Sequence, residues 1–511
     1  MRHEDHRQRA AAREAEDPHA PELARRPAID TPLSRRELVR RGLGAAALVA
    51  FPRLLDPSRA LGASPVPALA KAVRGPVLTP ASGAAYDTAR SVFDSLYDGT
   101  KPLAVVQPLD AKDVAAVVNW SRTTGVQIVA KSGGHSYGGY STVANGVVVD
   151  LSKLAGISVS SGHAAIGPGA RLGNIYETLG AHNVAIPAGT CPSVGIGGHV
   201  LGGGFGLASR AWGLASDNLV SVQIVTADGK VRVADAKHNA DLFWACRGGG
   251  GGNFGIVTRL TFRTHRVAQG AYFVASWPWT QAAQVVGSFL AWAPHQPDAL
   301  GALCRLAAGP GGPTVQVFGQ FLGSEAGLKN ALASLGPPAS KLDIGTSSWL
   351  DLVRRWAGCL GHTLPQCSAP GTQAFVGASD YIAEVPTAGQ RATFAAVVEA
   401  RGAQSGALLI DAYGGALNRI APGATAFVHR NQLASIQYFA AGNGASARGW
   451  INGARKALAP VVSGQAYVNY IDPQLANWQA AYYGTNLSRL RAVKKKYDPH
   501  NLFHFAQSIR P

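Results

Sequence analysis

The sequence has little charge and no long apolar run, and each shortage excludes a class of protein. Charged residues make up only 15% of the 511 residues and hydrophobic residues 47%, which is too apolar for an intrinsically disordered chain. No uninterrupted apolar stretch reaches the roughly 18 residues of a membrane-spanning helix, so we expect no stable membrane insertion. A chain of this length is expected to form two or three globular domains.

Cysteine is also scarce, and its spacing argues against a metal centre. The five cysteines form no CxxC pair and no zinc-type spacing, so we predict no metal site. Cys359 and Cys367 are close enough in sequence for one disulfide in an oxidising compartment, and the sequence leaves open whether it forms. Cys191 stands apart from Cys246 and Cys304 because it lies within a run of glycines.

The formal charge of +17 has a pattern that does not favour nucleic acid binding. Lysines and arginines are scattered, and no basic stripe interleaved with aromatic residues occurs. The densest cluster, residues 494–496, is typical of a solvated helix face. We therefore expect no nucleic acid partner.

The first 70 residues differ from the rest of the chain. Residues 1–33 are rich in charged residues, Ala and Pro, and are predicted to be disordered. In residues 34–70, Arg35 and Arg36 precede a short, weakly hydrophobic segment and then small residues. This pattern is typical of a twin-arginine export signal, with an ordinary basic helix as the alternative. It predicts a secreted or cell-envelope protein.

Three glycine-rich segments organise the chain after residue 79, at 131–139, 187–206 and 247–255. Backbone amides left bare by glycine allow a phosphate-bearing cofactor to approach closely. A flexible linker is disfavoured because apolar residues are interleaved with the glycines of the central segment. Neither GxGxxG nor a P-loop lies between a strand and a helix here, so a Rossmann or NTPase site is not indicated.

Hydrophobic periodicity between these segments predicts an α+β fold. Strands are expected at 103–107, 127–130, 146–151, 156–159, 163–167, 218–227 and 256–263, with helices after Asp110 and over 171–179. Farther along, strands at 272–276, 314–322 and 407–412 alternate with helices at 282–292, 326–335 and 389–400. The aromatic candidates for a sugar-binding or aromatic-binding surface there are Trp277, Trp279, Trp292, Trp349, Trp356 and Tyr381, with core packing as the alternative.

Six motifs spread over nearly the whole chain after residue 79 carry a family resemblance. They are Ser-Gly-Gly-His-Ser-Tyr-x-Gly at 132, Gly-Thr-Cys-x-x-Val-Gly-x-Gly-Gly-His at 189, Gly-Gly-Gly-Asn-Phe-Gly-Ile-Val at 250, Ala-Phe-x-His-Arg at 426, Tyr-x-Asn-Tyr-x-Asp at 467 and Tyr-Asp-Pro-x-Asn-x-Phe at 497. Together they resemble the berberine bridge enzyme-like flavoproteins, which share the FAD domain of vanillyl-alcohol oxidase and p-cresol methylhydroxylase (PCMH).

The resemblance implies the domain organisation. A two-lobed FAD-binding domain of the PCMH type is expected at residues 79–267, closed by a berberine-bridge-type C-terminal segment at 461–511. A substrate-binding domain, an antiparallel sheet covered by helices, is expected as an insertion at 268–460.

The resemblance also implies FAD attached covalently through both His135 and Cys191. A thiolate and a neutral imidazole are nucleophiles that suit an electron-poor flavin ring. His199 matches the histidine beside the flavin, where a donor stabilises negative charge on the reduced ring. The other expected FAD contacts are Lys131 (where arginine is commoner), Ser132, Gly133, Gly134, Ser136, Tyr137, Gly189, Thr190, Val194, Gly195, Gly197, Gly198, Gly202, Gly204, Asn253, Gly255, Ile256, Val257 and Asn501.

Tyr470 matches the catalytic base of the family. A phenol with an ordinary pKa near about 10 needs a neighbour that lowers this pKa, and the candidates are Asp411, Tyr413, Gln437 and Asn469. Asp411 is also a catalytic candidate, although a carboxylate raises the pKa of a nearby phenol unless it accepts the phenol's proton. Gln437 and Tyr413 are the expected substrate contacts.

These residues predict an exported flavoprotein oxidase. It would remove hydride from a C–H bond next to a hydroxyl or amine of a saccharide or secondary metabolite and pass the electrons to O2, giving H2O2. In the family, a residue such as Val194, three positions after the flavin-linked cysteine, is associated with an open path for O2. A flavin dehydrogenase with another acceptor and a flavin-binding protein without turnover are the alternatives. The sequence specifies neither the substrate nor the oligomeric state.

Overall fold

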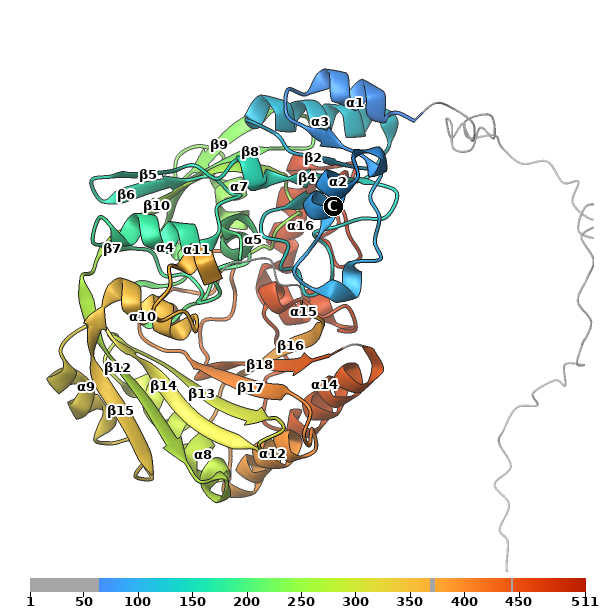
Figure 1. The fold of residues 1–511 in the computed structure, drawn as a ribbon. Helices are drawn as coiled ribbons and strands as arrows, with labels where there is room; N and C mark the ends of the chain where they lie inside the picture. The colour runs from blue at the N-terminus through green and yellow to red at the C-terminus, as the bar shows by residue number, and fades with distance from the viewer. Residues whose placement is uncertain (1–63, 368–372, 443) are drawn as a thin grey trace, which may run out of the picture. The chain divides into compact units, whose positions relative to one another are not determined.

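The computed structural model describes residues 64–367, 373–442 and 444–511. The extension predicted at 1–33 and most of the signal predicted at 34–70 lie outside these residues. The described part is an α+β fold, as predicted, with two smaller sheets above a seven-stranded sheet in the view of Figure 1. None of the described helices is both long and apolar enough to cross a membrane.

A four-stranded sheet with strand order β1-β2-β4-β3 forms the first lobe. Its strands are β1 (Val77–Leu78), β2 (Ala104–Val106), β3 (Ile128–Lys131) and β4 (Val147–Asp150). The last three are parallel, and α3 (Ala111–Thr124) connects β2 to β3. As predicted, this helix begins at Asp110, whose carboxylate accepts hydrogen bonds from two backbone N–H groups of the first turn.

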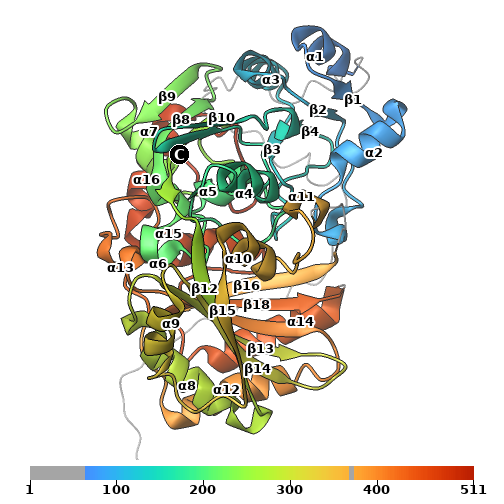
Figure 2. The same ribbon diagram turned by 60° about the vertical axis from the view of Figure 1, so that its left-hand side comes forward.

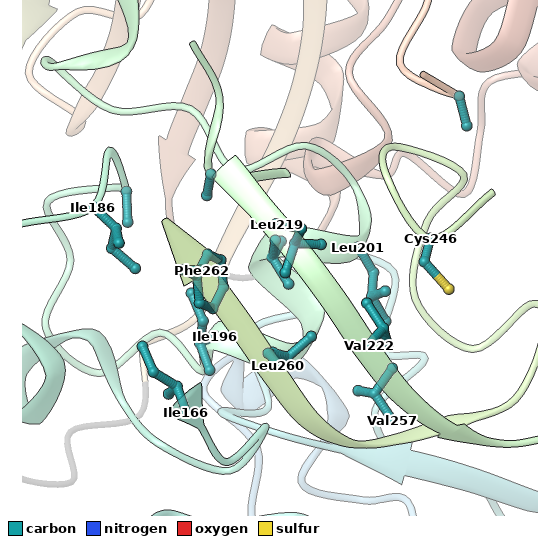
Figure 3. Close-up of a cluster of buried hydrophobic side chains, with 14 of the residues drawn as sticks. Ile166, Ile186, Ile196, Leu201, Leu219, Val222, Cys246, Val257, Leu260 and Phe262 are labelled. Carbon is teal, nitrogen blue, oxygen red and sulfur yellow. The ribbon is translucent and has the colours of Figure 1, made fainter. Parts of the chain in front are cut away.

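A five-stranded antiparallel sheet with order β5-β6-β10-β8-β9 forms the second lobe. Its strands are β5 (Ile157–Ser160), β6 (His163–Ile166), β8 (Leu219–Val225), β9 (Val231–Asp235) and β10 (Ile256–Arg263). Against it packs α5 (Ile196–Leu201), which lies within the central glycine-rich segment. Ile196 and Leu201 of α5 belong to the same core as Val222 and Phe262 (Figure 3). This packing fixes the position of His199 on the same helix.

A seven-stranded antiparallel sheet with order β15-β12-β14-β13-β17-β18-β16 forms the remaining layer. Its strands are β12 (Gln269–Trp277), β13 (Leu300–Ala308), β14 (Thr314–Phe321), β15 (Lys341–Ser348), β16 (Phe375–Ile382), β17 (Gly406–Ala412) and β18 (Ala434–Ala441). One face packs on α8 (Ala282–Trp292), α12 (Ala388–Glu399) and α14 (Gly444–Leu458), and α8 and α12 lie at the bottom of Figure 2. The opposite face is turned toward the two smaller sheets.

The remaining elements are short and mostly connect the sheets. They are α1 (Val66–Ala72), α2 (Ala84–Arg90), α4 (Leu172–Gly180), α6 (Ser209–Trp212), α7 (Ala240–Ala245), α9 (Glu325–Leu332), α10 (Trp349–Trp356), α11 (Leu364–Cys367), α13 (Ala416–Arg419), α15 (Trp478–Tyr483), α16 (Leu487–Tyr497) and the strand pair β7 (Val184–Ala185) and β11 (His265–Arg266). Cys359, between α10 and α11, forms a disulfide with Cys367, the last residue of α11.

The C-terminal segment is fastened to the third glycine-rich segment by Lys494, which corrects the interpretation of residues 494–496 as a solvated face at this one position, while Lys495 and Lys496 are exposed. Lys494 is fully buried on α16 and pairs with Asp498 at 2.7 Å. Its ammonium also donates to the carbonyl oxygens of Asn253 and Phe503, at 2.7 and 2.6 Å. A buried ammonium needs these acceptors because its hydration is lost. Residue 494 therefore holds the chain's end against the glycine-rich segment.

Candidate active site

A cavity of about 680 Å³ lies between the glycine-rich segments and the seven-stranded sheet. Its volume is in the range of small-molecule and cofactor sites. The glycine-rich segments supply one wall, and strands β13, β17 and β18 supply another. All three of the regions singled out in the sequence thus meet the sheet at one place.

His135 and Cys191 come together on the wall of this cavity. The hydroxyl of Ser193 lies 3.0 Å from His135 Nε2 and 3.4 Å from Cys191 Sγ, so one side chain contacts both residues predicted to hold the flavin. The ring of Phe93 stacks on the imidazole with centroids 4.0 Å apart. Burial, aided by the cation of Arg171, lowers the pKa of His135 to about 3. The imidazole is therefore neutral at neutral pH and keeps a nucleophilic lone pair.

Glycine is required where the first two glycine-rich segments touch. A Cβ on Gly133 would lie 2.2 Å from the backbone nitrogen of Gly195, and a Cβ on Gly195 would lie 2.1 Å from that of Gly133. This contact carries His135 and Cys191 to the same wall. In contrast, a Cβ on Gly198 would meet nothing within 4 Å, because this residue faces the cavity. There the bare backbone is open to a ligand.

His199 is held in one tautomer by the backbone. Its Nε2 accepts a hydrogen bond of 3.0 Å from the N–H of Gly189, and burial lowers the pKa of His199 to about 4. A neutral imidazole that accepts at Nε2 carries its proton on Nδ1, so only Nδ1 can donate. The side chain amide of Asn469 donates to the carbonyl oxygen of His199 at 2.8 Å and fixes this turn from the C-terminal segment.

Tyr470 lies in a cluster of tyrosines on the cavity wall. Its ring stacks on Tyr137 with centroids 5.3 Å apart and meets Tyr467 edge-on at 5.1 Å. Burial raises the pKa of Tyr470 well above 10, and the neighbouring Tyr137 and Asp411 raise it further. The expected neighbour that lowers this pKa is therefore absent from the described residues. Gln437 donates instead to the Tyr137 hydroxyl, at 2.7 Å.

Asp411 lines the same cavity from β17 and is 6% exposed. Burial raises the pKa of its carboxyl group to about 7. No salt bridge to it forms among the described residues, in contrast to buried acids such as Asp217, which pairs with Arg430 at 2.7 Å. A carboxyl group near neutrality can both take up and release a proton at physiological pH.

Most of the sequence-predicted cofactor residues line the cavity, and a few do not. Lining residues are Ser132, Gly133, Gly134, His135, Ser136, Tyr137, Gly189, Thr190, Cys191, Val194, Gly195, Gly197, Gly198, His199, Asn253, Gly255, Ile256 and Val257. Lys131, Gly202, Gly204 and Asn501 are not among them. The Lys131 ammonium instead contacts the carbonyl oxygens of Ala89 and Ser91 and lies 3.7 Å from Asp150. It thus serves loop packing.

Of the predicted catalytic and substrate-contacting residues, all but one line the cavity. Tyr470, Asp411, His199 and Gln437 line the cavity. Tyr413 lies behind the wall, 1% exposed, with its ring stacked on Phe205 at 5.4 Å and its hydroxyl 3.4 Å from that of Tyr381. Tyr413 therefore supports the wall, and contact with a substrate does not fit its position in this structure. The roles of the lining residues stay predictions.

The sequence did not predict most of the cavity-lining residues that the seven-stranded sheet supplies. Of the six aromatic candidates, only Trp356 lines the cavity, and Trp277, Trp292, Trp349 and Tyr381 are core residues. The unpredicted lining residues include Phe93, Leu303, Arg305, Phe318, Phe375, Leu409 and Phe439. The strands β13, β16 and β18 that carry several of them were not predicted, because both of their faces are largely buried and no alternation of apolar and polar residues marks them.

The comparisons with known proteins agree with this geometry. A family model described as "FAD binding domain" matches residues 102–235, and one described as "Berberine and berberine like" matches residues 466–510. The chain is 34% identical over 424 residues to an uncharacterized FAD-linked oxidoreductase, YgaK, of Bacillus subtilis, covering 80% of this chain and 91% of that one.

Two further relatives carry more informative names. A chitooligosaccharide oxidase of Gibberella zeae is 33% identical over 436 residues, covering 80% of this chain and 88% of the relative. Among solved structures, the BBE-like 1 protein of Physcomitrella patens superposes with a TM-score of 0.79 at 33% identity, covering 87% of this chain and 99% of that one.

Proposed function

This chain belongs to the berberine bridge enzyme-like family of FAD-dependent oxidoreductases, and on that premise we propose that it is an exported saccharide oxidase with bicovalent FAD. The observation that carries the proposal is the approach of His135 Nε2 and Cys191 Sγ to one hydroxyl, that of Ser193. Two nucleophiles placed side by side on a cavity wall suit two bonds to one ring system.

The residues of the cavity fit FAD. The open backbone at Gly198 and the donor at His199 Nδ1 suit a ligand with phosphates and a ring that gains negative charge. His135 would hold the 8α-methyl carbon and Cys191 C6 of the isoalloxazine, as in the family. Bound FAD would supply a two-electron acceptor for the substrate C–H bond, with O2 as the final acceptor and H2O2 as the product.

Tyr470 and Asp411 handle the proton in this proposal. Hydride loss from a C–H bond is completed only if the adjoining O–H proton leaves, so a base must lie within reach of that hydroxyl. The raised pKa of Tyr470 keeps its phenol protonated at neutral pH, so Tyr470 can accept the substrate's proton only by giving up its own. Asp411, with a pKa of about 7, is the acceptor that the cavity offers.

A saccharide substrate is supported by the aromatic walls of the cavity. Phe318 and Trp356 stack with centroids 5.5 Å apart, and Phe375 and Phe439 stack at 5.4 Å. Aromatic faces pack against the C–H bonds of sugar rings, which are apolar on their flat sides. The similarity to a chitooligosaccharide oxidase agrees with this substrate class.

We propose export because Arg35 and Arg36 match the paired arginines of a twin-arginine signal. The disulfide between Cys359 and Cys367 supports it, because disulfides persist mainly in oxidising compartments. Leu69 on α1 is fully buried, so this helix is part of the folded core. Cleavage of the signal before α1 would leave this packing intact.

The test uses the purified holoenzyme. Acid-precipitated protein should stay yellow, and so should His135→Ala and Cys191→Ala alone, whereas the double variant should release its flavin. Ser193→Ala is the matched control, because it removes the bridging hydroxyl but neither attachment atom. An aerobic screen of saccharides should then yield H2O2. Free FAD from the acid-treated wild type would refute bicovalent attachment, and slow reoxidation in air would instead indicate a dehydrogenase.

A further inference from the structure

Arg305 brings a cation to the cavity and has no partner among the described residues. It lies on β13, lines the cavity and is exposed there. No hydrogen bond, salt bridge or ring contact of its guanidinium occurs in the part of the chain that the structure describes, although most other arginines of the seven-stranded layer are paired. Asp411 is the only carboxylic acid among the described lining residues, and its pKa shift reflects burial alone, without compensation by Arg305.

The register of the sheet places Arg305 beside the reacting end of the cavity. Asp411 pairs across the strands with Leu303, and Arg305 is two residues farther along β13. Such diagonal neighbours lie about 7–8 Å apart. Arg305 also pairs directly with Leu409, whose other neighbour is Gln437. A sugar whose hydroxyl meets Tyr470 and Asp411 would therefore extend toward the guanidinium.

The surroundings of Arg305 make a neutral substrate costly. Leu303, Leu409 and Phe318 line the cavity beside it, and Gln316 is its cross-strand neighbour on β14, so a bound sugar would displace water from the cation on its apolar side. A buried charge without a partner is strongly unfavourable, whereas a carboxylate can form two parallel hydrogen bonds with a guanidinium. The net charge of +17 would also attract an anionic substrate.

We propose that Arg305 binds a carboxylate of the substrate, so that the preferred substrates are uronic acids and oligosaccharides that carry them. The inference rests on the proposed saccharide oxidation and adds the charge of the substrate to it. The carboxylate belongs either to the oxidised ring or to the next one, and the two sources are separated by using both a free uronic acid and a uronic disaccharide.

The experiment compares matched pairs by H2O2 release from the holoenzyme. D-glucuronate is paired with D-glucose, D-galacturonate with D-galactose, and digalacturonate with galactobiose. The wild type should have the higher kcat/KM for the acidic member of at least one pair. Arg305→Gln should raise KM for that acid roughly 10- to 100-fold with little change in kcat, and should improve turnover of the neutral member. Arg305→Lys, which keeps the charge but not the bidentate geometry, should be intermediate.

Arg259→Gln is the matched control, because Arg259 is exposed on β10 and does not line the cavity. It removes the same charge and should leave both members of each pair unchanged. Oxidation of neutral sugars as efficiently as their acids, with no response to Arg305→Gln, would overturn this inference and leave the saccharide oxidase intact. If no sugar of either kind is oxidised, the proposed function fails and this inference fails with it.

Discussion

Replacing Asp411 with asparagine tests the proton pathway most directly. The substitution keeps the size of the side chain and removes the group that can take a proton from Tyr470. With a pKa of about 7, the Asp411 carboxyl is about one tenth ionised at pH 6 and about nine tenths ionised at pH 8. If the carboxylate is the acceptor, reduction of the flavin by substrate should become about tenfold faster over this interval in the wild type.

The Asp411→Asn variant should lose this pH dependence together with its rate. A lost general base costs roughly 10²–10⁴ in rate, and asparagine does not ionise in this range. The assay is anaerobic stopped-flow reduction of the holoenzyme, followed by flavin absorbance, with flavin content measured as a control. The assignment of Asp411 as proton acceptor would be refuted if the variant's reduction rate still rose with pH around pH 7, or if the wild-type rate were equal at pH 6 and pH 8.

The same substitution should stabilise the folded protein at alkaline pH. The pKa of the folded Asp411 carboxyl, about 7, lies above its ordinary value of 3.8, so ionisation favours the unfolded state. The loss of folding free energy that comes from burying the ionised carboxylate is roughly 4 kcal/mol above pH 7, and it disappears as the pH falls toward 4. Thermal melts should therefore separate the variant from the wild type at pH 8 more than at pH 5. An equal or lower melting temperature of the variant at pH 8 would contradict the burial argument.

Three further predictions concern the base, the oxidant and export. Tyr470→Phe keeps the ring packing against Tyr137 and removes the acceptor oxygen. Flavin attachment should survive, while reduction of the flavin by substrate slows by roughly 10²–10⁴. A near-normal reduction rate would mean that Tyr470 has only a packing role. Val194→Leu, at a half-buried position on the cavity wall, should slow reoxidation by O2 in rapid mixing but not reduction by substrate; equal reoxidation would leave Val194 as a core residue. Replacing Arg35 and Arg36 with lysine should leave flavin-loaded protein in the cytoplasm, and unchanged secretion in cell fractionation would exclude this signal.

The regular elements that the sequence predicts well are those with one buried face or a clear cap. The helix after Asp110, the helix over 282–292 and the strand over 256–263 are confirmed, because a capping side chain marks the first and apolar residues that bury one face mark the other two. The position of the helix inside residues 187–206 was not predicted, since glycine lowers helix propensity and tertiary packing of Ile196 and Leu201 decides the outcome.

The candidate site was predictable only where it lies on the glycine-rich segments. Those segments bring His135 and Cys191 together, yet the contact between Gly133 and Gly195 that does so joins residues far apart in sequence. Likewise, the sequence predicts Lys494 to be one of three solvated lysines. Only the fold shows that its ammonium donates to the carbonyl oxygens of Asn253 and Phe503. Long-range partners of polar groups are not encoded in local periodicity.

The substrate side of the cavity shows why charge in an apolar strand deserves a functional explanation. On β13, Ala302, Cys304 and Leu306 pack against the helices, while Leu303 and Arg305 face the cavity. The strand is apolar throughout except at Arg305, and no group among the described residues compensates that charge. The same face of β17 carries Asp411, whose raised pKa records the same lack of compensation. One acid and one cation left unpaired on a single sheet face are expected where a ligand, rather than the protein, supplies the missing partners.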